Sequence, residues 1–142
     1  MSVLVDTSIW SLALRRRARD LNGRERLLVT ELAELVRDGR AQIIGLIRQE
    51  LLSGIKTHSQ FEKLRETLRA FRDEPVDTED HEAAAKASND CRAKGIAVSV
   101  VDMLICAVAR RRGMAIFTTD PDFVNYAREL ALKLHSARGR SA

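Results

Sequence analysis

The sequence predicts an α/β fold, in which a mostly parallel sheet of about five strands lies between layers of helices. Short apolar runs alternate with longer segments of helical periodicity along the whole chain. In addition, Gly39, Gly95 and Gly113 each follow a stretch rich in Arg, Lys or Ala and precede a short apolar stretch. Glycine at such a position is typical of a helix C-terminus. We therefore expect a three-layer α/β/α arrangement.

The expected elements follow in chain order. The run VLV at 3–5 has the composition of a buried strand. Strands are expected at 2–5, 41–45, near 75–78, at 114–118 and near 132–135. Helices are expected at 8–15, 23–38, 47–57, 59–72, 79–94, 100–112 and 121–130. Because no segment is typical of a linker or a repeat, we predict one domain over 1–136 and a disordered tail over 137–142.

The composition is that of an ordinary globular protein, with 45% hydrophobic and 31% charged residues among 142. The longest apolar run, VSVVDMLICAVA, is too short to span a bilayer and contains Asp102. Residues 2–14 have the wrong order of charges for a secretory signal, because their Arg run follows the apolar part. We therefore expect a soluble, cytoplasmic protein in which Cys91 and Cys106 are reduced core thiols.

The charge balance is basic, with 24 Lys and Arg against 20 Asp and Glu, and 19 of the cations are Arg. Arginine suits bidentate phosphate contacts. The Arg clusters at 15–19, 110–112 and 138–140 therefore indicate either a polyanionic partner or a solvated basic face. Aromatic residues make up only 4%, which argues against recognition of nucleic acid by stacking.

Four carboxylates stand where the fold would gather functional groups. Asp6 ends the first strand, Asp120 ends the strand at 114–118, Asp102 lies at the start of a helix, and Glu50 lies on the helix after the second strand. In open α/β sheets such groups gather at the C-terminal ends of the parallel strands. We therefore expect these four side chains at one edge of the sheet.

Helix capping is an alternative explanation for three of them. Asp6 precedes a helix, Asp120 precedes Pro121, and Asp102 follows Ser99 by three residues, the spacing of a capping box. Capping does not explain Glu50, which shares a helical face with apolar residues.

A cluster of carboxylates raises the pKa of each member, and a multivalent cation would relieve that repulsion. Oxygen ligands without Cys or His favour Mg²⁺ or Mn²⁺ over zinc. One or two such ions would support displacement at a phosphodiester. The three histidines are isolated and are expected to be surface or structural residues.

Four segments, VLVDTSIW, RQELLSG, SVVDMLICAVA and FTTDPDF, resemble in order and interval the PIN-domain ribonucleases. More narrowly, they are similar to the VapC toxins of type II toxin–antitoxin (VapBC) systems, and the resemblance covers nearly the whole chain. It implies an Mg²⁺- or Mn²⁺-dependent endoribonuclease. The implied catalytic and metal-binding residues are Asp6, Glu50, Asp102 and Asp120, with Asp6 and Asp102 as the most direct ligands.

The resemblance also implies auxiliary residues. Ser8 and Thr118 would orient carboxylates or water, Asp122 is acidic in only some members, and Ser99 would cap the helix that presents Asp102. It further implies a homodimer and a VapB-like antitoxin whose C-terminal segment occupies the active-site groove. The helices at 23–38 and 47–57 are candidates for that contact, or are simply core.

Two other functions are compatible with parts of the pattern. A non-catalytic RNA-binding or interaction module would use the basic surface alone. A phosphoacceptor signalling domain needs paired acids after its first strand and a Lys after a later one, whereas here Asp6 stands alone and no Lys ends the strand at 114–118. Replacing Asp102 would leave function intact only in a non-catalytic module.

Overall fold

A parallel sheet runs through the centre of the computed structural model, which describes residues 1–138. The middle strand, β1 (Val3–Val5), pairs in parallel with β2 (Ala41–Gln42) on one side and with β3 (Ala115–Phe117) on the other. The order is therefore β2-β1-β3. Every residue of β1 and β3 is buried, as continuous apolar strands between two helix layers should be.

Single parallel bridges extend the sheet at both edges. Ile43 pairs with Asp73, and Ile116 pairs with Leu134, which makes five parallel segments in all. The strand expected near 75–78 is wrong in position: the Glu74 N–H donates to the Ile43 carbonyl at 2.8 Å, and pairing stops before Pro75. Proline has no N–H to donate to a strand neighbour. The last segment lies within the predicted 132–135.

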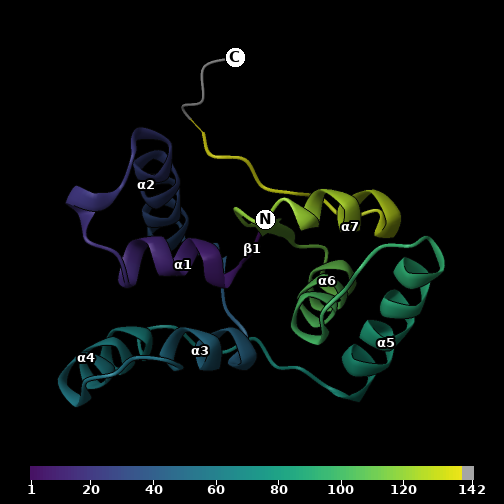
Figure 1. Cartoon of the computed structure of the whole chain (residues 1–142), viewed down its shortest axis with the longest axis horizontal. Coiled ribbons are helices and arrows are strands. Elements are labelled where there is room, and N and C mark those ends of the chain that lie inside the picture. The colour runs from purple at the N-terminus through teal and green to yellow at the C-terminus, as the bar shows by residue number, and fades with distance from the viewer. Residues whose placement is uncertain (139–142) are drawn as a thin grey trace.

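Seven helices cover the sheet within the described residues. Figure 1 shows α1 to α4 on one side of the strands and α5 to α7 on the other, so the predicted three-layer α/β/α fold is confirmed. The helices are α1 (Thr7–Leu14), α2 (Gly23–Arg37), α3 (Gly45–Leu52), α4 (His58–Leu68), α5 (Thr78–Ala93), α6 (Val100–Arg112) and α7 (Asp122–Leu130). A short 3₁₀ turn at Ala18–Asp20 was not expected.

Two helices are shorter than predicted. The α3 helix ends at Leu52 instead of 57, and Gly54 follows at φ 83°, a left-handed conformation that directs the chain away from the helix axis. The α4 helix ends at Leu68 instead of 72, where the Arg48 guanidinium binds the Leu68 carbonyl at 2.9 Å. The predicted glycine ends of α2, α5 and α6 are confirmed, with φ values of 69°, 75° and 65°.

The α6 helix is the apolar centre of its layer. Met103 to Ala109 are all buried, whereas Val100 is 83% exposed. The helix packs against β1 and β3 and precedes β3 across a tight turn at Gly113. It therefore runs opposite to the strands, and its N-terminus lies at their C-terminal edge. Cys91 and Cys106 are free and buried.

A buried carboxylate, Asp80, joins α5 to α6. Its side chain is fully buried and accepts hydrogen bonds from Arg111 at 2.6 Å and from Arg112 at 2.7 Å. The Arg112 guanidinium holds the pKa of Asp80 well below its usual range. Two members of the Arg cluster at 110–112 thus form ion pairs within the chain, although Arg111 is itself exposed.

The C-terminal segment is attached to α2 through Glu31. His135 Nε2 lies 2.6 Å from Glu31 Oε2, and Arg138 Nε donates to Glu31 Oε1 at 3.0 Å. Ala137 is buried, so 137 and 138 are packed, unlike the tail predicted there, because the buried Glu31 carboxylate needs partners. Residues 139–142 of that tail lie outside the described residues. None of the helices described is long and apolar enough to cross a membrane.

Candidate active site

Asp6 lies where β1 ends, and its carboxylate is held by two hydroxyls. Ser8 Oγ and Thr118 Oγ1 both donate to Asp6 Oδ2, at 2.8 and 2.7 Å. The Asp6 backbone occupies the N-cap position of α1, but its side chain makes no capping hydrogen bond. Capping therefore does not account for this carboxylate, and the orienting contacts expected of Ser8 and Thr118 are present.

Thr118 also connects Asp6 to Asp120. Its hydroxyl accepts the Asp120 N–H at 3.0 Å while donating to Asp6. Asp120 Oδ1 in turn accepts the Asp122 N–H at 2.9 Å, at the start of α7. The N-cap position of α7 is Pro121, with no side-chain cap, so Asp120 is not the cap itself; one of its oxygens accepts the Asp122 N–H, and no hydrogen bond within residues 1–138 reaches the other.

Asp102 lies in the first turn of α6, where its N–H donates to Ser99 Oγ at 3.1 Å, as the predicted cap requires. Its carboxylate is partly buried, and the Tyr126 hydroxyl lies 3.4 Å from Oδ2. Burial, together with the negative charges of Asp6 and Asp120, raises the pKa of Asp102 to about 6. These three carboxylates are therefore near enough to repel one another.

Glu50 is brought to the same region by α3. Its Oε1 accepts a hydrogen bond from Thr7 Oγ1 at 2.7 Å, which joins the middle of α3 to the first residue of α1. Because Thr7 follows Asp6 directly, this bond places Glu50 beside the end of β1. Glu50 is partly buried, so its carboxylate retains contact with solvent.

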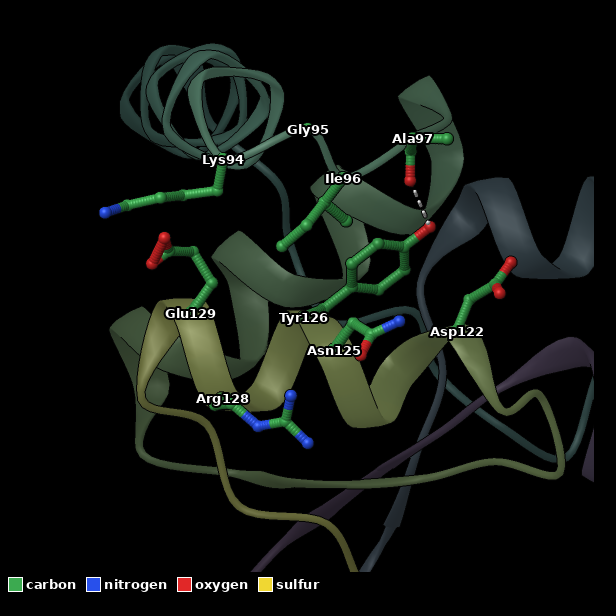
Figure 2. Close-up of a pocket in the computed structure, with 9 residues that line it drawn as sticks. All are labelled: Lys94, Gly95, Ile96, Ala97, Asp122, Asn125, Tyr126, Arg128 and Glu129. Atoms are coloured by element: carbon green, nitrogen blue, oxygen red, sulfur yellow. Dashed lines mark hydrogen bonds between the residues drawn. The ribbon is translucent and has the colours of Figure 1, made fainter.

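Sequence reasoning missed two contributors, Thr7 and Tyr126. Thr7 stands inside the VDTS segment, so a hydroxyl next to the first acid was a usable signal. No sequence signal pointed to Tyr126, because its contact with Asp102 depends on how α7 packs against the rest of the chain. Figure 2 shows the Tyr126 ring inside a pocket of about 600 Å³, with its hydroxyl bonded to the Ala97 carbonyl at 3.2 Å.

The same pocket opens next to the acidic edge. In Figure 2, Asp122 lies at one end of it, while Lys94 and Glu129 lie at the other. Cations and carboxylates both line it, so the pocket has no dominant charge. Asp122 makes no contact with the four predicted acids through its carboxylate within the described residues; only its N–H reaches Asp120.

The donor set fits a hard divalent cation. The groups at this edge are carboxylate and hydroxyl oxygens, which Mg²⁺ and Mn²⁺ prefer. Across residues 1–138, no three His, Cys, Asp or Glu side chains are arranged to hold one ion by themselves. Mg²⁺ usually keeps several waters and takes one or two carboxylates together with substrate phosphate. The assignment of particular ligands stays a prediction.

Comparison with known families decides the family. The PIN domain model matches residues 3–129, which include all four acids. The chain belongs to the PIN domain family. PIN domains are generally nucleases and typically use divalent metal ions. The comparison with curated proteins gave no match.

The solved structures that share this fold include toxin–antitoxin complexes. FitAcB from Neisseria gonorrhoeae aligns with a TM-score of 0.75 at 18% identity, over 96% of this chain and 99% of that one. VapBC2 from Rickettsia felis, bound to a DNA fragment from its promoter, aligns at 0.71 and 17%, over 95% and 98%. VapBC-1 from nontypeable Haemophilus influenzae aligns at 0.71 and 14%, over 96% and 98%. At these identities the likeness establishes the fold.

Proposed function

We propose that this chain is a metal-dependent endoribonuclease that hydrolyses RNA phosphodiester bonds and acts as the toxin of a toxin–antitoxin pair. The observation that carries the proposal is the gathering of Asp6, Asp102 and Asp120 at one edge of the sheet. Thr118 bridges the first and third of them, and burial together with their charges raises the pKa of the second. Carboxylates that raise one another's pKa in this way are typical of functional sites.

Asp6 and Asp102 are proposed as the most direct ligands of Mg²⁺ or Mn²⁺, with Glu50 and Asp120 completing the catalytic set. A bound ion would supply neutralisation of the phosphate charge and a lower pKa for an attacking water.

The chain's own residues prepare this site. Ser8 and Thr118 both donate to Oδ2 of Asp6, so the orientation of that carboxylate is fixed while Oδ1 receives no hydrogen bond within residues 1–138. Thr7 fixes Glu50 in the same manner. Hydrogen bonds of this kind hold ligating carboxylates in place and are costly to remove from metal sites.

The proposed partners follow from the similar structures, which are complexes of FitAB and VapBC toxins and antitoxins. We propose that a VapB-like antitoxin binds this chain, that the chain forms a homodimer, and that it acts on RNA in the cytoplasm. The test is growth of bacteria that express the chain: the wild type should arrest growth, whereas Asp102→Asn should not.

The enzymatic part is tested with labelled RNA and a titration of Mg²⁺ or Mn²⁺. Wild type should cleave only when metal is added, and Asp102→Asn should lose at least a hundredfold in rate. RNA binding without cleavage by the wild type would instead favour a non-catalytic binding module. Cleavage that needs no metal and is unaffected by the substitution would contradict the proposal.

A further inference from the structure

A cleft of about 530 Å³ lies between the end of α1, the segment that follows α3, and α4. We call it the basic cleft. Its cations are Arg15 from the end of α1, Lys56 from the segment before α4, and Lys63 from α4 itself. No carboxylate and no aromatic side chain lines it. It therefore differs from the pocket in Figure 2, which Asp122 and Glu129 also line.

The three cations are free of internal partners. Arg15, Lys56 and Lys63 are exposed, and none forms an ion pair within residues 1–138. Glu62, which precedes Lys63 on α4, binds Arg65 at 2.6 Å and does not line the cleft. By contrast, Arg111 and Arg112 are bound to Asp80. The basic cleft thus offers positive charge that the fold itself does not use.

The basic cleft and the acidic edge lie at opposite ends of α1. This helix begins at Thr7, which binds Glu50, and ends beside Arg15. Its 8 residues span about 12 Å, a distance that a few nucleotides of an extended strand can cover. The Thr7–Glu50 bond holds α1 against α3, so both walls of the cleft are connected to the site. A polymer that lies across the carboxylates and runs along α1 would reach the cleft.

We propose that the basic cleft binds the sugar–phosphate backbone of the RNA substrate a few nucleotides away from the scissile bond, a proposal that rests on the proposed ribonuclease function. Cations and an amide, Gln60, provide donors for phosphate and ribose oxygens. Leu14 and Ile55 supply an apolar floor. Since no aromatic ring lines the cleft, it would bind the strand through its backbone and not by stacking on its bases.

The test compares two triple variants that lose the same charge, both in the inactive Asp102→Asn background. The first carries Arg15→Gln, Lys56→Gln and Lys63→Gln. The matched control carries Arg24→Gln, Arg110→Gln and Lys133→Gln, three exposed cations outside the cleft that form no ion pair within residues 1–138. Binding of a fluorescent single-stranded RNA of mixed sequence is measured against KCl concentration. Because all six positions are exposed, thermal melts should show both variants folded.

The cleft variant should bind at least tenfold more weakly at low salt, and its plot of log affinity against log salt should be flatter by about 2, since each phosphate contact on single strands contributes about 0.7. The control should change much less. Equal losses in the two variants would overturn the proposal, because only overall charge would then matter. The proposal would also be overturned if the cleft variant bound RNA as well as the control variant but lost binding of a polyglutamate peptide. The cleft would then bind an acidic protein segment instead.

The proposed function is separated from the basic cleft by a parallel assay with Asp102 intact. Failure of the wild type to cleave RNA, alongside the expected loss in the cleft variant, would contradict the nuclease activity and support RNA binding in the cleft. Cleavage by the wild type with equal binding losses in both variants would contradict the cleft alone.

Discussion

Among individual residues, Asp102 is held in the least favourable place for a charge. Its carboxylate is partly buried and stands near Asp6 and Asp120, which raises its pKa to about 6. The folded protein therefore keeps this proton to a higher pH than the unfolded chain does. Consequently, the free energy of unfolding falls as pH rises from about 4 to about 6 and stays lower above that range.

Asp102→Asn, which cannot ionise, should be more stable than wild type above pH 6 in the absence of divalent metal. We expect a gain of about 1 kcal/mol after allowing for solvent around the carboxylate, and no difference below pH 4. Urea unfolding in EDTA at pH 4, 5, 6 and 7 measures this. A variant that is less stable than wild type at pH 7 would contradict the electrostatic account.

Thr7 is the second residue whose role can be isolated. Thr7→Val removes the hydroxyl that donates to Glu50 at 2.7 Å while keeping the side-chain shape. We expect RNA cleavage to fall about tenfold, in line with other hydrogen bonds to metal-ligating groups, and stability to fall by about 1 kcal/mol. Thr7→Ser keeps the hydroxyl and is the control; it should cleave nearly as fast as wild type. Equal rates for the Val and Ser variants would exclude a positioning role.

For individual residues, the sequence predicted contacts between residues close together in the chain but not contacts between distant ones. Ser99 was predicted to cap the helix of Asp102 and does so, because a cap and its partner lie three residues apart. The contact between Tyr126 and Asp102 was not predictable, because it depends on how α7 packs. Thr118 was identified through the family resemblance, and its bridging of Asp6 to Asp120 became visible only in the structure.

Among the helices, α6 connects the candidate site to a buried ion-pair network. Asp102 lies at its N-terminal end, and Arg111 and Arg112 at its C-terminal end bind Asp80 of α5. Asp80 is fully buried and depends on Arg111 and Arg112 for its charge. An unpaired buried carboxylate is costly. The orientation of α6, and with it the position of Asp102, is therefore coupled to this ion-pair network.

Arg112→Met should lower the free energy of unfolding by about 3 kcal/mol, because it leaves Asp80 with an incomplete set of partners. Arg110→Met is the matched control: Arg110 is exposed two residues away and forms no ion pair within residues 1–138, so its loss should cost little. Urea unfolding at pH 7 compares the two. Similar losses in both variants would contradict a specific role for Asp80.

The Asp80 ion-pair network also shows that sequence periodicity predicts where helices lie but not which residues of different helices contact one another. The sequence predicted α5 and α6 within one or two residues, because glycine, cap and apolar spacing are local signals. It could not show that Arg111 and Arg112 face Asp80, more than 30 residues away. The strand near 75–78 was misplaced for a similar reason: its pairing with Ile43 is a long-range contact.

For the whole molecule, the parallel sheet decides where the acids meet. The strands β1 and β3 end at the same edge, α6 begins there, and Glu50 reaches it through Thr7. The alternation of strands and helices was enough to predict this edge. The mixed-charge pocket of Figure 2 on one side and the basic cleft on the other were not predictable, because their walls come from segments distant in sequence.

The proposed homodimer is a prediction about the whole molecule. Light scattering coupled to gel filtration should give twice the 15.9 kDa mass of the chain at micromolar concentration. A mass of one chain at every concentration tested would contradict it. The experiment needs no metal and is independent of the active site.

Binding of Mn²⁺ by isothermal titration calorimetry tests the central claim most directly, because it measures whether the acidic edge holds a divalent cation. Wild type should bind Mn²⁺, and Asp102→Asn should bind it more than tenfold more weakly. The control is Asp90→Asn, which removes an exposed acid that pairs with Lys86 on α5; it should bind like wild type. Equal Mn²⁺ affinity in wild type and Asp102→Asn would contradict the account.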